Sequence, residues 1–102
     1  MPRSEAEVAR AQQDVEDVFA ALAHRTRRRI LLVLQMRGGR LTAGQIAERF
    51  ACAWPTTTRH LKVLVQAGLV DVVKQGRERV YTLNRQRLLA VTRDWLVWFE
   101  PT

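Results

Sequence analysis

Residues 54–83, WPTTTRHLKVLVQAGLVDVVKQGRERVYTL, decide the fold, because their apolar pattern changes from a helical period to strand-like alternation. The first part predicts a helix from about Trp54, with Pro55 in the first turn, where a missing N–H is tolerated. Gly68 ends this helix. Its predicted core stripe consists of Thr57, Leu61, Leu64 and Val65. The opposite side is predicted to carry Arg59, Lys62, Val63 and Gln66.

The second part of this stretch predicts a β-hairpin. The runs 69–74 and 78–83 are rich in β-branched residues, and Gln75–Gly76–Arg77 between them is a turn signal. The polar side chains around the tip can reach phosphates or a minor groove: Lys74, Gln75, Arg77 and Arg79.

Four further helices are expected outside residues 54–83. Residues 5–21 have apolar side chains at three- and four-residue steps, and a second helix begins near His24 and ends at Gly38–Gly39. A third, short helix opens at Leu41–Thr42, with Thr42 as its N-cap, and a last helix runs over about 85–99. The expected fold is therefore mainly α, with five helices and a two-stranded hairpin wing, in one domain over residues 1–102.

Length and composition favour a folded soluble domain. Of 102 residues, 47% are apolar and 26% are charged, which argues against disorder. No apolar run approaches the length of about 18 residues that a membrane span needs, and the first residues do not form a signal peptide. A single cysteine excludes an intramolecular disulfide, so we expect a cytoplasmic protein without membrane contact.

The positive charge is concentrated in the middle of the chain. Residues 1–23 have a net charge of −3, residues 24–93 of +12 and residues 94–102 of −2, which together give +7. Such a basic centre favours a polyanionic partner, although a solubilising surface or an arginine-rich genome would give the same charge. Arg27, Arg28 and Arg29 point to different sides of the second helix, so at least one should pair within the protein.

The order of two short helices, a glycine stop and a basic hairpin is that of a winged helix-turn-helix, which places one helix in the major groove of duplex DNA. Trp54 either stacks on a sugar or packs over the third helix. The candidate DNA-reading residues of the fourth helix are Trp54, Thr56, Thr58, Arg59 and Lys62. Thr42 and Gln45 of the third helix are candidate supporting contacts.

Four stretches resemble the ArsR/SmtB family of bacterial repressors. They are VFAALAHRTRRRILLVL, LTAGQIAERF, PTTTRHLKVLVQAGLV and QGRERVYTL, and they keep the family's order between Val18 and Leu83. The resemblance implies a homodimer built from the first and last helices, which represses transcription by occupying a palindromic operator. The last helix also has apolar residues on too wide an arc for one protomer to cover. The candidate dimer residues are Val8, Val15, Phe19, Leu88, Trp95, Trp98 and Phe99.

The sequence departs from the family pattern at two helix starts. His24–Arg25 replaces the usual Asp–Pro pair of the second helix, and Ala51 and Ala53 replace the glycine and serine before the recognition helix. Ala53 has no side-chain acceptor, so the N-cap is lost at a cost of about 1 kcal/mol. These changes leave the operator sequence open.

The positions that bind metal in relatives carry residues that cannot ligate. The resemblance places Thr42 and Gly44 at the Cys-x-Cys pair of the third helix. It places Arg85, Arg87, Trp98 and Pro101 at the zinc ligands of the last helix. We therefore expect no metal and no cofactor.

The remaining alternatives rest on few residues. A site of Cys52, His60 and His24 with an acid, or a thiol sensor at Cys52, is an alternative to an inert buried thiol and a hydrogen-bonded structural His60. No phosphate loop, acidic pair or nucleophile–base pair indicates an enzyme. A winged-helix protein-interaction module is the alternative to a DNA-binding repressor. No small-molecule effector can be named.

Overall fold

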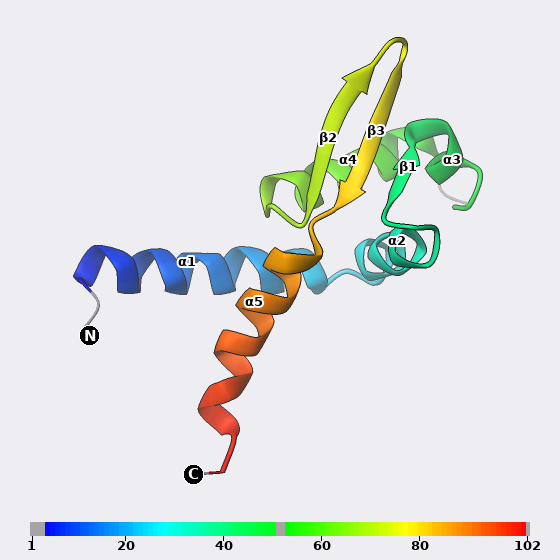
Figure 1. Cartoon of the computed structure of the whole chain (residues 1–102). Coiled ribbons are helices and arrows are strands. Elements are labelled where there is room, and N and C mark those ends of the chain that lie inside the picture. The colour runs from blue at the N-terminus through cyan, green and yellow to red at the C-terminus, as the bar shows by residue number, and fades with distance from the viewer. Residues whose placement is uncertain (1–3, 51–52, 102) are drawn as a thin grey trace.

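The computed structural model describes residues 4–50 and 53–101 of the chain (Figure 1). The mainly helical winged helix-turn-helix fold is confirmed. Its elements are α1 (Glu5–Leu22), α2 (Arg25–Met36), β1 (Arg40–Thr42), α3 (Ala43–Ala47), α4 (Trp54–Gln66), β2 (Val70–Gln75), β3 (Glu78–Leu83), α5 (Arg85–Leu96) and the short 3₁₀ helix η1 (Val97–Phe99).

The sheet has one strand more than the sequence pattern predicted. The order is β1-β3-β2, with both neighbours antiparallel to β3, so that Leu41 lies opposite Tyr81 and Val72 lies opposite Tyr81 on its other side. Three residues are too few to show an alternating pattern, and β1 forms because β3 provides its hydrogen-bond partners. The hairpin of β2 and β3, hereafter the wing, is as predicted.

A continuous apolar core lies beneath the sheet and joins α1 to α4. Val18, Leu34, Ile46 and Leu64, from four different helices, are at most 1% exposed. In α4, Thr57 and Leu61 are buried as predicted, but Val63, predicted on the opposite side, is half-buried against the core. Within the described residues, α5 contributes no fully buried side chain, so its apolar surface lies largely outside this core.

The ends of α3 and α4 follow local sequence signals. Thr42 caps α3 through a capping box, in which its Oγ1 accepts from the Gln45 N–H while Gln45 Oε1 accepts from the Thr42 N–H. Ala53 precedes α4 without a side-chain cap, as predicted. At the other end, Gly68 has a φ of +76°, and the Gly68 and Leu69 N–H groups donate to the carbonyls of Val65 and Leu64. This is a Schellman motif, which fixes where α4 ends.

Two of the three consecutive arginines bind the end of α1. Arg27 donates from Nε to the Ala21 carbonyl at 2.7 Å and from Nη2 to that of Ala20 at 3.1 Å, and Arg28 donates from Nη1 to that of Leu22 at 2.8 Å. The prediction that at least one pairs within the protein is confirmed. Cations at the last carbonyls of a helix also interact favourably with its dipole.

The wing and the last helix leave the body in opposite directions. In Figure 1 the wing points up, α5 descends from the end of β3, and the N-terminal half of α1 extends to the left. The helix α5 ends at Leu96, and residues 97–99 continue as η1 rather than as the α-helix expected there. The structure therefore has a packed centre and two helical extensions.

Candidate nucleic-acid interface

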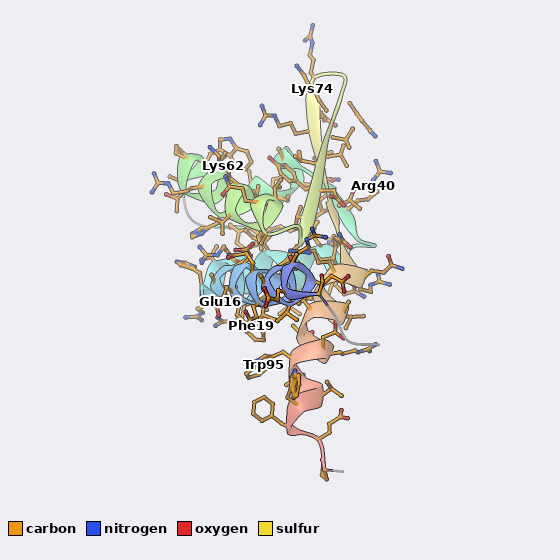
Figure 2. The ribbon with its side chains drawn as sticks, turned by 90° about the vertical axis from the view of Figure 1, so that its left-hand side faces the viewer. Glu16, Phe19, Arg40, Lys62, Lys74 and Trp95 are labelled. Carbon is orange, nitrogen blue, oxygen red and sulfur yellow. The ribbon has the colours of Figure 1, made fainter. Side chains whose placement is uncertain are left out.

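One side of α4 is exposed and polar. Thr56, Arg59 and Lys62 are exposed, and Trp54 at the start of the helix is 40% exposed. The buried side of the same helix packs against the core, so these side chains point away from the protein. Figure 2 shows Lys62 on this helix, on the same side of the molecule as the wing with Lys74 near its tip. The arrangement presents cations and a hydroxyl group together.

Thr58 is placed differently from the prediction. Its Oγ1 is buried and has no hydrogen-bond partner among the described residues. The hydroxyl therefore does not face solvent beside Arg59, although the two residues are neighbours in the helix. A turn of about 100° separates successive side chains of a helix, which is enough to point one inward and the next outward.

Thr42 and Gln45 are used within the protein. Their side chains complete the capping box of α3 at 3.2 Å and 2.9 Å. Gln45 is nevertheless exposed. Both residues therefore fix the first turn of the helix that precedes α4, and a contact of either with DNA stays a prediction.

The wing carries its predicted polar residues in the open: Lys74, Gln75, Arg77 and Arg79 are all exposed. Its loop consists of Gly76 and Arg77, with a φ of +63° at Gly76 only, the pattern of a type II′ turn. Lys74 lies opposite Arg79, in the row that continues through Val72 and Tyr81 to buried Val70. Because opposite residues share a face of the sheet, these two cations lie on the side that packs against the core and α4.

A cluster of basic side chains lies where α4 meets the start of α2. The His24 and His60 rings are 4.2 Å apart, and Arg27 donates from Nη1 to His60 Nδ1 at 3.4 Å. Burial lowers the pKa of His60, and the positive charges of His24, Arg27 and Arg59 lower it further. A neutral, hydrogen-bonded His60 agrees with its predicted structural role.

His24 replaces the missing Asp of the family pattern. Its Nδ1 accepts from the Thr26 N–H at 3.1 Å, so the imidazole caps α2 as a carboxylate would. The sequence shows the departure at His24–Arg25 but not this replacement. Histidine is an uncommon N-cap, and only the observed backbone geometry reveals it.

No three metal-ligating side chains gather within residues 4–50 and 53–101. Cys52, on which two alternatives depended, lies outside the described residues. At the positions that match zinc ligands of relatives, Arg85 donates to Gln35 Oε1 at 3.0 Å and Arg87 donates to Asp14 Oδ1 at 3.2 Å. Both guanidinium groups are engaged in contacts within the protein.

A second exposed surface, the α1–α5 face, is apolar. Trp98 is 82% and Phe99 69% exposed, while Trp95 contacts both Phe19 and Phe99, with ring centroids 5.1 Å and 4.9 Å apart. Figure 2 shows Phe19 and Trp95 beside each other, on the far side of the molecule from the wing. Among the described residues, Val8, Val15, Trp95 and Trp98 line a groove of about 670 Å³ between α1 and α5.

Three details of this face differ from expectation or were missed. Leu88, a candidate dimer residue, is half-buried against the protein's own core. Val91 and Val97 also line the groove, although neither was selected from the sequence. Their signal was the helical spacing of apolar residues, which does not separate core from interface.

No helix in the described part of the chain combines the length and apolar character that crossing a bilayer requires.

The short α3, the exposed side of α4 and the basic wing define a winged helix-turn-helix domain, a class of DNA-binding proteins. Residues 22–73 match a family model described as a helix-turn-helix domain. The chain is 36% identical to the transcriptional repressor SdpR of Bacillus subtilis (strain 168), over 83% of this chain and 91% of SdpR.

Solved structures agree. An ArsR-like transcriptional regulator from Rhodococcus sp. RHA1 has 32% identity and a TM-score of 0.73, covering 86% of this chain and 80% of that one. A domain from Mycobacterium bovis, described as a homodimeric winged helix-turn-helix DNA-binding domain, has the same TM-score at 24% identity over 98% and 91% of the two chains, and shares the fold. The chain belongs to the ArsR/SmtB family of DNA-binding transcriptional regulators, which are not enzymes.

Proposed function

We propose that the protein is a homodimeric, sequence-specific transcriptional repressor that occupies a palindromic operator in the bacterial cytoplasm and does not respond to metal. The observation that carries this proposal is the separation of two surfaces. A basic surface of α4 and the wing lies on one side of the core, and the uncovered apolar α1–α5 face lies on the other.

The basic surface fits the major groove of duplex DNA. A groove about 12 Å wide admits one helix, whose exposed side then reads base edges. On α4, Arg59 is the proposed base-reading residue, since arginine donates two hydrogen bonds to guanine. Thr56 and Lys62, on either side of Arg59, are proposed to contact the phosphate backbone of the DNA. The wing cations Lys74 and Arg79 face the side of α4 and are proposed to contact phosphates.

The α1–α5 face is proposed to bind a second copy of the chain. Large exposed aromatic side chains such as Trp98 are costly in a monomer, and a two-fold dimer covers the same patch on both copies. The homodimer described for the Mycobacterium bovis domain of the same fold supports this assembly. Two recognition helices would then read half-sites about 34–36 Å apart.

The absence of a metal response is proposed from the chemistry of the matching positions. Arg85 and Arg87 are permanently charged donors, and both already bind groups of the protein. Zinc requires lone pairs from thiolate, imidazole or carboxylate groups. Zinc addition is therefore expected to leave operator affinity unchanged.

Fluorescence anisotropy at about 150 mM salt tests the proposal. The protein is titrated against duplex DNA from its own promoter region and against a shuffled duplex of equal composition. A preference of about 10³-fold or more for the promoter duplex is expected of a specific regulator. Binding to neither duplex would contradict the proposal and favour a protein-interaction module.

Arg59→Ala refines this test. If Arg59 reads a base, the variant loses about 1–3 kcal/mol on the promoter duplex and much less on the shuffled duplex. Arg93→Gln is the matched control, because Arg93 is an exposed cation on α5, outside the proposed DNA-binding surface of α4 and the wing. Equal losses of Arg59→Ala on both duplexes would reduce Arg59 to a phosphate contact.

A further inference from the structure

Arg87, near the start of α5, joins three helices. Its backbone N–H is fixed by the N-cap Asn84, whose Oδ1 accepts it at 3.2 Å. Its side chain donates from Nε to the carbonyl of Ala67, at the end of α4, at 2.7 Å, and from Nη2 to Asp14 of α1 at 3.2 Å. One guanidinium therefore contacts the recognition helix and also the first helix of the α1–α5 face.

Gly68 leaves room for this side chain. A Cβ at residue 68 would lie 2.6 Å from Arg87 Nε and 2.8 Å from Arg87 Cδ, closer than side-chain atoms approach one another. The arginine therefore lies directly over the turn that ends α4. Gly68 serves both this close approach and the positive φ of the Schellman motif.

The contact also adds a hydrogen bond at the end of α4. The last carbonyls of a helix have no partner within it. The Schellman motif binds those of Leu64 and Val65, and Arg87 binds that of Ala67. A cation at this end is favourable for the helix dipole as well. The link is thus made at the C-cap of α4, directly beside the last residue of the helix.

The backbone alone gives α5 a weaker hold on α4. The N–H of Asn84, the N-cap of α5, donates to the carbonyl of Leu69 at 2.9 Å, and Leu69 directly follows Gly68. A single backbone hydrogen bond leaves rotation about that junction open. The two arms of the Arg87 guanidinium fix the direction, because its donors lie in one rigid plane.

We propose that Arg87 is a positioning residue that fixes the angle of α4 relative to the α1–α5 face, and thereby the separation of the two recognition helices in the dimer. This inference rests on the proposed homodimer. Its consequence is selectivity for the spacing of half-sites, because the distance between two helices is set by the angle at which each leaves the shared face. Arg87 itself lies away from the proposed DNA-binding side chains and is not a base-reading residue.

The distance between spin labels on the two α4 helices of the full-length dimer tests this role. The parent protein carries Cys52→Ser, which removes the single native cysteine, and Lys62→Cys, which places a label on an exposed position of α4. Double electron–electron resonance without DNA gives the distribution of distances. Arg87→Gln is expected to widen this distribution at least twofold at a temperature where circular dichroism shows that the variant is folded.

Two variants complete the design. Arg93→Gln removes an equal charge from an exposed position of the same helix and should retain the parent width. Arg87→Lys keeps the charge but has one terminal nitrogen instead of a fork, so an intermediate width is expected. If Arg87→Gln does not fold, Arg87→Lys provides the test.

The outcomes separate the two proposals. A folded, dimeric Arg87 variant with the parent's distribution would overturn the positioning role and leave the homodimer intact. A parent protein without any dipolar distance would overturn the homodimer, and the positioning role with it. Widening in Arg93→Gln equal to that in Arg87→Gln would also overturn the role, because loss of any charge on α5 would then suffice.

Discussion

The centre of the molecule and the α1–α5 face both carry large apolar side chains, but these side chains have opposite surroundings. In the centre, Leu34, Leu64 and Leu69 are fully buried against residues from other elements of the same chain. On the α1–α5 face, Trp98, Phe99 and Val97 are more than half exposed. One chain therefore completes the first region and leaves the second without a cover.

The comparison separates two uses of the same amphipathic pattern. In α4 the apolar side stabilises the fold and the polar side is left free for a partner. In α5 the apolar arc is wider than the body can cover, and no side chain of this helix is fully buried. A helix with more apolar surface than its own chain covers indicates an interface. A helix with one apolar side and one polar side indicates packing on the core by the first and exposure to solvent by the second.

The largest effect is expected in the centre. Leu64→Ala removes a fully buried side chain of α4 and should lower the free energy of unfolding by about 2–5 kcal/mol at every protein concentration. Chemical denaturation followed by circular dichroism measures it. A decrease in the free energy of unfolding below about 1 kcal/mol would mean that packing around Leu64 does not stabilise the centre.

The next effect is expected on the α1–α5 face. Trp98→Ala should leave the monomer core intact and raise the dimer dissociation constant by about 10³-fold, the effect of losing a strong interface residue of about 2 kcal/mol from each of the two protomers. Sedimentation equilibrium measures this constant. Met36→Ala is the matched control, because Met36 is 74% exposed but lies on α2. Equal changes in both variants would remove the distinction between the two surfaces.

A smaller effect is expected at the wing. Arg79→Ala removes one exposed cation from each protomer, and if each neutralises one phosphate, the slope of log K against log salt should become less negative by about 2. Anisotropy titrations between 50 and 200 mM salt measure the slope on promoter and shuffled duplexes alike. An unchanged slope would exclude the Arg79 side chain from the DNA interface.

The smallest effect concerns pH and the cluster between α2 and α4. Because the pKa of His60 is lowered in the folded protein, the unfolded chain takes up this proton first as the pH falls. Stability should therefore decrease as the pH falls through the ordinary histidine value of about 6.5. Thermal unfolding between pH 7.5 and 5.5 measures the trend, and His60→Gln should reduce it. If the stability of His60→Gln decreases more steeply with falling pH than that of the parent protein, this assignment is wrong.

Local signals made most of the fold predictable. The cap at Thr42, the missing cap at Ala53 and the end of α4 at Gly68 depend on residues within one turn of the position concerned. The strand β1 was not predictable, since its three residues become a strand only beside β3, which is distant in the sequence. The exposure of the wing cations was predictable because the tip of a hairpin is exposed wherever the hairpin packs.

Side-chain contacts across the fold account for what the sequence did not reveal. The hydroxyl of Thr58 faces inward because of how α4 docks on its neighbours, which the helical spacing of apolar residues does not reveal. The partners of Arg87 lie 20 and 73 residues away along the chain. By its resemblance to the family, Arg87 occupies the position of a zinc ligand, and only the structure reveals its contacts with Ala67 and Asp14.

The strand order also bears on how the protein avoids self-association through its sheet. With β3 in the middle, β1 and β2 are edge strands, and their outer backbone groups have no strand partner among the residues that the structure describes. The edge formed by β1 is only three residues long, and β2 carries the charged residues Asp71 and Lys74 at exposed positions. Short length and charge are the features by which natural edge strands resist aggregation. The sheet is thus protected from strand-to-strand pairing, which leaves the α1–α5 face as the surface proposed for assembly.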